Sequence, residues 1–203
     1  MGKKSLPRRL LLERGPNPLR DVYVHNRGDG WWLYADGYRL AAERLTTDAE
    51  NLTRYQRNSV IYPILFLYRQ HLELMLKYII LVGQRLRSEA TRPPHHHRLR
   101  DLWGEGKRVL RERSISVPSK DLTRIEHTID ELTALDPSSD LFRYPMDKTA
   151  EFPFPEELRQ FDLSIFRAKL AKVSETLRRI AGLLDADLDL EREFYHDLYG
   201  GYH

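Results

Sequence analysis

A long apolar run near the middle of the chain dominates its pattern of hydrophobic and polar positions. Residues 60–88, VIYPILFLYRQHLELMLKYIILVGQRLRS, would place apolar side chains on nearly every side of a helix. A helix that is apolar all round is a buried one. Pro63 would lie in the first turn of this helix, where its missing N–H does no harm. The run therefore predicts a long central helix around which the other elements pack.

Charged and polar residues interrupt this run, namely Arg69, His71, Glu73 and Lys77. They argue against a membrane span, because charges near the middle of a bilayer are costly. Arg69, Glu73 and Lys77 are spaced at i, i+4 and i+8, so they share one stripe of the helix. Buried charges must be paired. The stripe is either an internal ion-pair ladder that fixes how other helices dock, or the border of a polar cleft.

Helical periods recur along the rest of the chain, with no internal repeat and no sustained strand pattern. They predict helices over residues 31–47, 98–113, 119–135 and 156–184, and then a short acidic last helix. The fold class expected is all-α, an up-and-down helical bundle of five or six helices with two long central helices.

The charge distribution suggests how the chain is divided. Residues 1–20 hold six Lys/Arg and one Glu, whereas residues 184–203 hold one Arg and six Asp/Glu. We expect a basic N-terminal arm, a helical bundle and an acidic C-terminal helix with a tail, spanning residues 1–30, 31–184 and 185–203. Residues 136–155 are irregular and rich in proline, and a loop of that length is usually functional or disordered.

Composition limits the possible function classes. The 203 residues include no cysteine, which excludes disulfides and thiolate ligands or nucleophiles. No signal peptide precedes the bundle, so we expect a cytoplasmic protein. The formal net charge is only +3, but residues 84–113 hold nine Lys/Arg, four Asp/Glu and three histidines. This stretch indicates either an anion footprint, with RNA or a nucleotide as the ligand, or a solvated helical hairpin.

The histidine triplet His95–His97 is the first candidate for chemistry. Three consecutive residues cannot readily turn toward one ion, and no carboxylate cluster accompanies them, so we expect no metal and no other cofactor. Four residues separate Arg92 from His97. Such a pair could cleave RNA, since His moves the proton of the 2′-OH and Arg stabilises the charge of the phosphorane.

Arg143 and Tyr144, in the sequence FRYP, form a second candidate. Arg would clamp a phosphate, and Tyr would offer a stacking face for a base. Alternatively, Arg143 is a structural residue held by Asp140 or Asp147.

Three of these segments, in this order, resemble the HEPN-domain family (higher eukaryotes and prokaryotes nucleotide-binding). FLYRQHLELMLKYII is similar to that family's second helix, with Glu73, Leu76 and Lys77 as its internal Glu and Leu-Lys pair. HHHRLRDLW resembles the His-x-L-x-x-L signature of many members, and FRYP resembles the R-Y-P of nucleotide-binding members. The preceding WWLYADGYRLAAERL also suits the first helix of that fold, and together these segments cover roughly residues 31–184.

The resemblance implies a helical bundle that homodimerises and, in many members, works in toxin–antitoxin or antiviral defence systems as a metal-independent ribonuclease. The family's catalytic motif is an Arg, four to six residues, and a His. Arg92 and His97 have this count, whereas no His follows Arg143 at such a spacing. A non-catalytic member that binds RNA or a nucleotide therefore remains an alternative to an enzyme.

The leading hypothesis is an HEPN-like protein that binds RNA or a nucleotide and, if it is an enzyme, acts as a metal-independent endoribonuclease. His97 or His71 would be the base and Arg92 or Arg143 the charge stabiliser. The residues expected to contact or line the ligand site are Arg69, Glu73, Arg92, His97, Arg143 and Tyr144. We expect a homodimer, and a partner protein encoded alongside. The alternative is a non-catalytic dimeric helical adaptor that binds a protein partner.

Overall fold

The computed structural model of the chain describes residues 16–22, 30–136, 142–143 and 160–199. Contacts between Cα atoms divide the chain into two units, Met1–Gly30 and Trp31–His203. In the first unit a 3-10 turn, Pro18–Arg20, follows Asn17, whose side-chain oxygen accepts a hydrogen bond from the N–H of Leu19 at 3.0 Å. No residue of this turn is buried, so the described part of the first unit has no core of its own.

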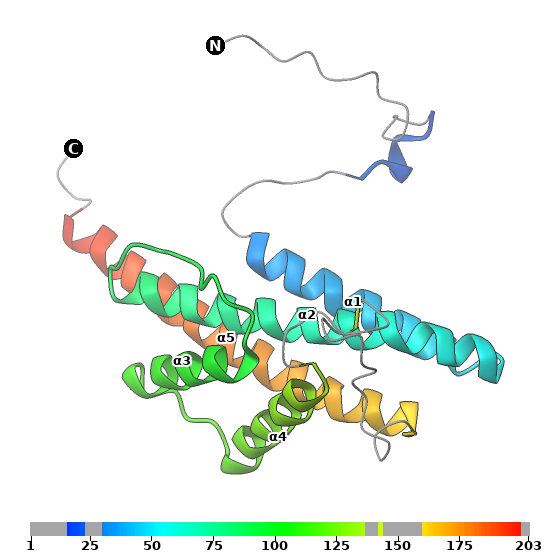
Figure 1. The fold of residues 1–203 in the computed structure, drawn as a ribbon. Helices are drawn as coiled ribbons and strands as arrows, with labels where there is room; N and C mark the ends of the chain where they lie inside the picture. The colour runs from blue at the N-terminus through cyan, green and yellow to red at the C-terminus, as the bar shows by residue number, and fades with distance from the viewer. Residues whose placement is uncertain (1–15, 23–29, 137–141, 144–159, 200–203) are drawn as a thin grey trace, which may run out of the picture. The chain divides into compact units, whose positions relative to one another are not determined.

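Five α-helices follow among the described residues, coloured from blue to red in Figure 1. They are α1 (Gly30–Ala49), α2 (Arg54–Leu86), α3 (Leu99–Glu112), α4 (Ser119–Leu135) and α5 (Leu163–Tyr199). The described residues include no strand. The predicted all-α class and the helical bundle with two long helices, α2 and α5, are confirmed.

The central helix α2 is buried on all sides over most of its length, as its pattern predicted. Every residue from His71 to Gly83 is buried, and α2 shares its longest interface with α5 and the next longest with α3. A tilted ring pair joins Trp32 of α1 to Tyr78 of α2, with the ring centroids 5.7 Å apart. Helices α5 and α3, with Trp32 of α1, therefore cover α2 and leave its charged residues little access to water.

Small residues form the buried face of α1. Ala35, Ala42 and Ala49 are fully buried and repeat at seven-residue intervals, so they lie on one face of α1. At the first of them, His71 Nδ1 lies 2.9 Å from the Ala35 carbonyl oxygen. Because Trp32 contacts Tyr78 while Ala35 contacts the earlier His71, α1 runs antiparallel to α2.

The connection between α2 and α3 returns along α2, and α3 then runs in the same direction as α2. A Cβ on Gly106 would lie 3.9 Å from the Ile79 side chain, and one on Gly83 would lie 2.5 Å from Val109. Later residues of α2 thus face later residues of α3, so the helix axes are parallel. This return path places residues 95–98 beside the middle of α2, and it decides where the candidate site forms.

The ends of the two long helices, α2 and α5, differ from the sequence expectation. Helix α2 begins at Arg54 rather than at 60, because Thr53 and Gln56 form a capping box, with bonds of 3.3 and 3.1 Å. Pro63 consequently lies inside the helix and not in its first turn. Its ring removes the N–H that would bond the Ser59 carbonyl, and the residue is exposed, where water can satisfy that carbonyl.

The second difference concerns the acidic C-terminal residues. The sequence predicted a helix over 156–184 and a separate short helix after it. Residues 160–162 are not helical, and α5 is instead continuous from Leu163 to Tyr199. Arg113, the C-cap residue of α3, holds this part of the helix through Asp187 and Glu191, at 2.7 and 2.6 Å. The acidic residues therefore extend the second long helix. Among the described helices, none combines the length and apolarity needed to cross a membrane.

Candidate functional site

The stripe of charges on α2 forms a buried ion-pair ladder. Arg69 Nη1 donates to Glu73 Oε2 at 3.3 Å, and Lys77 Nζ donates to Glu73 Oε1 at 3.0 Å. Glu73 is only 1% exposed, and the side chains of Arg69 and Lys77 are almost as deeply buried. The i, i+4 spacing read from the sequence thus places one carboxylate between two cations.

Two residues from outside α2 complete the cluster. Asp136, which follows α4, has its Oδ2 3.4 Å from Arg69 Nε. His97, which precedes α3, accepts a hydrogen bond from Arg69 Nη2 at its carbonyl oxygen, at 3.0 Å, and its ring Nδ1 lies 2.7 Å from Glu73 Oε1. We call Arg69, Glu73, Lys77, His97 and Asp136 the Glu73 cluster; it ties the ends of two connecting segments to the middle of α2.

The surroundings of Glu73 keep its carboxyl group ionised. Burial by itself would raise the pKa of Glu73, but the hydrogen bonds from Lys77 and His97 outweigh burial and lower it below its ordinary value. Facing an ionised carboxylate, His97 Nδ1 must carry a hydrogen and donate it. Glu73 therefore selects the tautomer and fixes the orientation of the His97 ring.

His97 is the part of the cluster that solvent reaches. Its side chain is 62% exposed, although the carboxylate that holds it is buried. A buried anion that orients an exposed imidazole is the arrangement by which proteins prepare a histidine for proton transfer. The geometry can thus present a general base at the surface without a metal ion.

The beginning of α3 lies directly after this histidine. Arg98 is the N-cap residue and provides no side-chain cap, so the first N–H groups of the helix lack the side-chain acceptor that usually satisfies one of them. The Arg98 guanidinium is largely exposed and pairs with Asp101 at 2.7 Å. An uncapped helix N-terminus with an arginine is favourable for a phosphate, so this point beside His97 suits an anion.

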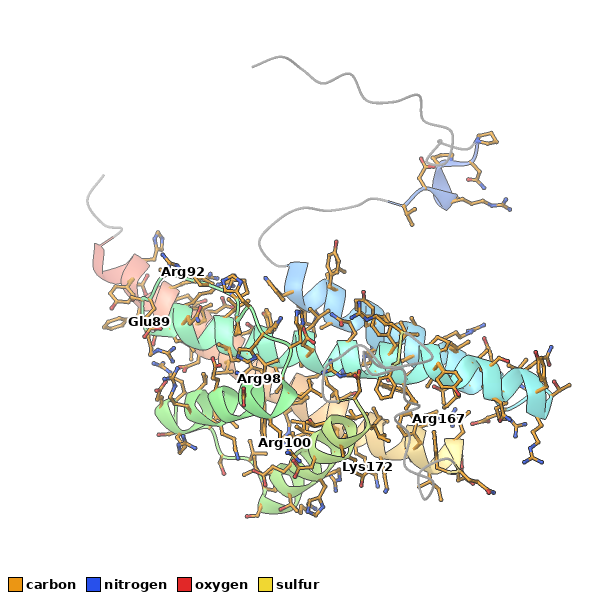
Figure 2. All side chains as sticks on the ribbon, in the orientation of Figure 1. Glu89, Arg92, Arg98, Arg100, Arg167 and Lys172 are labelled. Carbon is orange, nitrogen blue, oxygen red and sulfur yellow. The ribbon has the colours of Figure 1, made fainter. Side chains whose placement is uncertain are left out.

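Arg92, the predicted partner of His97, lies elsewhere. Gln84 binds its backbone in two directions: the Arg92 N–H donates to Oε1 at 2.8 Å, and Nε2 donates to the Arg92 carbonyl at 3.1 Å. Gln84 lies three turns beyond Glu73 on α2, which corresponds to about 16 Å along the axis. Figure 2 likewise shows Arg92 well apart from Arg98, so the structure does not bring Arg92 and His97 together.

The other predicted residues are not all in one place. His71 is buried between α2 and α1, where burial lowers its pKa to about 4, so it is a neutral packing residue out of reach of a substrate. Arg143 is exposed and follows Phe142, whose side chain is buried in the main core. Tyr144 lies outside the described residues. Arg69 and Glu73, expected to contact a ligand, are buried beneath the surface.

Carboxylates of other helices engage much of the basic stretch. Arg100 pairs with Asp130 of α4 at 2.6 Å, and Lys107 pairs with Glu126 of α4 at the same distance. Arg113, as described above, is held by α5. The local excess of positive charge read from the sequence is therefore smaller in the folded chain, although exposed ion pairs are weak and can exchange for phosphate contacts.

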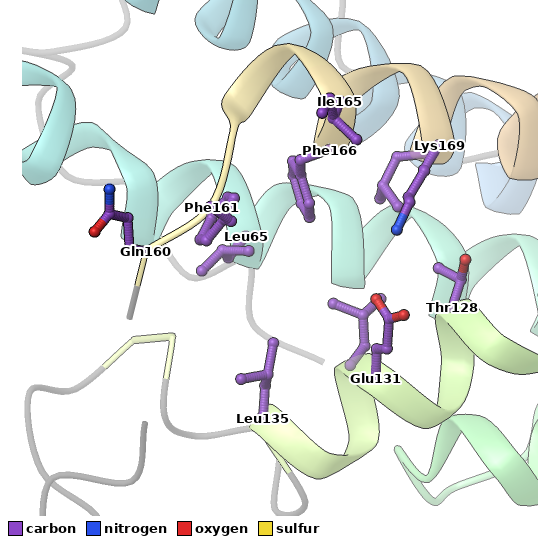
Figure 3. A pocket seen from close by; sticks show the side chains of 11 residues that line it. Leu65, Thr128, Glu131, Leu135, Gln160, Phe161, Ile165, Phe166 and Lys169 are labelled. Carbon is purple, nitrogen blue, oxygen red and sulfur yellow. The ribbon is translucent and has the colours of Figure 1, made fainter. Parts of the chain in front are cut away.

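An apolar cavity of about 160 Å³ lies between α2, α4 and α5. Leucine and phenylalanine side chains make up most of its wall, and Figure 3 shows Glu131 of α4 and Lys169 of α5 extending toward one another across it. None of the residues singled out from the sequence lines this cavity. The Glu73 cluster is therefore a separate feature of the fold.

Sequence reasoning missed two members of the site, Asp136 and Arg98. Asp136 is the residue directly after a predicted helix. A polar side chain is common at such a position, so it gave no signal of a buried ion pair. Arg98 adjoins His97 and opens a predicted helix, and the absence of Ser, Thr, Asp or Asn at that position was a signal of an uncapped N-terminus.

Comparison of the chain with models of protein families, with curated proteins and with solved structures found no match.

Proposed function

We propose that the protein is an HEPN-like RNA- or nucleotide-binding protein of a bacterial defence or toxin-type system and that it cleaves RNA without a metal ion. It would work in the cytoplasm and, as the resemblance implies, as a homodimer, with a partner protein encoded alongside. The observation that supports this most is the 2.7 Å hydrogen bond between His97 Nδ1 and Glu73 Oε1, which joins an exposed imidazole to a buried carboxylate.

The reaction supported by this pair is attack of a ribose 2′-OH on the adjacent phosphorus. With Nδ1 donating to Glu73, Nε2 of the neutral His97 ring is the nitrogen that accepts the proton of the 2′-OH. The P–O5′ bond then breaks, and the 5′-oxygen takes a proton from a donor such as water, leaving a 2′,3′-cyclic phosphate. Because Lys77 and Arg69 hold Glu73 in place, the base needs no reorganisation during the step.

Arg98 and the N-terminus of α3 would stabilise the negative charge of the phosphorane. Arg98 follows His97 in the chain, and its pair with Asp101 is exposed, so a phosphate oxygen can replace the carboxylate at small cost. Arg92 is held at Gln84, about 16 Å along α2 from Glu73, which is too far for it to act on the same phosphate. It would contact the RNA backbone several nucleotides away. Arg143 and Tyr144 stay in the proposal as contacts to the ligand.

A specific observation favours the second candidate, a non-catalytic dimeric adaptor that binds a protein partner. Much of the positive charge around the site is paired within the chain: Arg100, Lys107 and Arg113 each bind carboxylates of α4 or α5. In this function the Glu73 cluster would only hold α3 and the end of α4 on α2.

The test is cleavage of labelled total RNA and tRNA by the purified protein in the presence of EDTA. The variants are His97→Ala, Arg98→Ala and Arg143→Ala, with His95→Ala as the matched control because His95 is also exposed and belongs to the same triplet. We expect cleavage that survives EDTA and His95→Ala, and that falls by about 100-fold or more in His97→Ala.

The other outcomes separate the candidates. If the wild type does not cleave RNA but RNA raises its melting temperature, the protein binds RNA without catalysis. Equal loss of cleavage in His95→Ala and His97→Ala would contradict the role given to the Glu73–His97 pair. If the protein neither cleaves nor binds RNA, the result would favour the adaptor.

A further inference from the structure

The C-terminal part of α5 carries an exposed apolar stripe. Leu183, Leu190 and Phe194 are large apolar residues with exposed side chains; Leu190 is 65% and Phe194 is 62% exposed. At 100° per residue these three positions fall within an arc of about 40°, and they span about 16 Å of the helix axis. Figure 1 shows that the last turns of α5, in red, continue past the other helices.

This stripe is distinct from the side of α5 that packs on the bundle. Leu184 and Leu188, which are buried, lie about a third of a turn away around the helix. On the intervening side, Arg113 binds Asp187 and Glu191 and so anchors the helix to α3. The packing of the bundle thus holds the stripe outward instead of covering it.

The other edge of the stripe is acidic. Glu193 and Asp197 are exposed there, and among the described residues no ion pair engages either of them. Asp189 lies further around the helix from the stripe and forms an ion pair with Arg192 at 3.3 Å. An apolar stripe with an anionic edge repels RNA and anionic lipid, since both carry negative charge.

We propose that this face, Leu183, Leu190 and Phe194 with Glu193 and Asp197, binds a basic amphipathic helix of a partner protein. The straight stripe along one helix suits a second helix that packs lengthwise upon it, with apolar residues at i, i+3 or i+4 and i+7. Lysine or arginine beside those residues would pair with Glu193 and Asp197, which supplies charge complementarity. A second copy of this face would instead bring acidic edges together.

A synthetic peptide of leucine and lysine serves as the probe, with about 18 residues so that it exceeds the length of the stripe. Its apolar residues repeat with the helical period, and a scrambled peptide of the same composition lacks that period. Binding of the two fluorescent peptides to the full chain is measured by anisotropy at physiological salt. We expect the amphipathic peptide to bind about tenfold more tightly than the scrambled one.

Two double variants locate the binding site. The double substitution Leu190→Ser with Phe194→Ser should weaken binding of the amphipathic peptide by about tenfold, because apolar contact is lost while the charge of the face is kept. Leu33→Ser with Leu40→Ser is the matched control, since these leucines of α1 are exposed to a similar degree. All four residues are exposed, so the melting temperature of each variant should match that of the wild type.

Three results of the peptide experiment would overturn the proposal. The amphipathic peptide does not bind; or the scrambled peptide binds as tightly as the amphipathic one; or the α1 control variant weakens peptide binding as much as the Leu190→Ser, Phe194→Ser variant does. Sedimentation of the wild type and of the Leu190→Ser, Phe194→Ser variant is the second measurement. A wild-type dimer that dissociates in this variant would identify the face as a self-interface and would also overturn the proposal. None of these results depends on whether His97 cleaves RNA.

Discussion

Replacement of Glu73 by glutamine tests the buried cluster most directly. In the folded chain both carboxylate oxygens accept from donors: Oε1 from Lys77 and His97, and Oε2 from Arg69. Glutamine has the same shape but only one carbonyl oxygen, so its NH2 group must face a donor on one side or the other. The substitution therefore removes the negative charge and creates a donor–donor contact in one step.

The magnitude follows from what Glu73→Gln leaves behind. Lys77 is 5% exposed, and Glu73 is the carboxylate with which it is paired, whereas Arg69 keeps Asp136 at 3.4 Å. Removing one partner of a buried ion pair costs about 3–5 kcal/mol, because the remaining charge is buried without compensation. That is a large part of the 5–15 kcal/mol by which ordinary domains are stable.

The assay is urea unfolding followed by far-UV circular dichroism at neutral pH. Adding Lys77→Met to Glu73→Gln should recover about 1–3 kcal/mol, since the uncompensated charge is then gone. Asp101→Asn is the surface control; its pair with Arg98 is exposed, so the loss should stay below about 1 kcal/mol. A loss under about 1 kcal/mol for Glu73→Gln, or strict additivity in the double variant, would refute the reasoning.

Two further predictions concern packing and pH. Gly83→Ala should lower the free energy of unfolding in urea by about 1–3 kcal/mol, because its Cβ would lie 2.5 Å from Val109. The control Gly104→Ala has open space around its Cβ and should not destabilise the fold. Equal effects of the two substitutions would contradict the close approach of α2 and α3. His71 has its pKa lowered to about 4, so the unfolded chain takes up a proton below about pH 6.5 that the folded chain does not. Stability should fall by about 3 kcal/mol as the pH drops from about 6.5 to about 4, and His71→Gln should remove that part of the slope; an unchanged slope would refute the assignment.

The sequence alone determined the features that depend on local periodicity. The all-round apolar pattern predicted the burial of α2, and the amphipathic period over 119–135 coincides with α4. The i, i+4 spacing of Arg69, Glu73 and Lys77 predicted their ion pairs, because a helix brings such positions together whatever surrounds it. These features need no knowledge of the path that the chain takes between helices.

Only the tertiary structure decided which distant residues join that stripe. Twelve residues connect α2 to α3, and their return path along α2 places His97 on Glu73 while Gln84 holds Arg92 about three turns away. In the sequence, Arg92 and His97 are close neighbours, so spacing alone paired them. Loop paths and long-range contacts such as Asp136 on Arg69 depend on the packing of the whole chain, and no local period of residues encodes them.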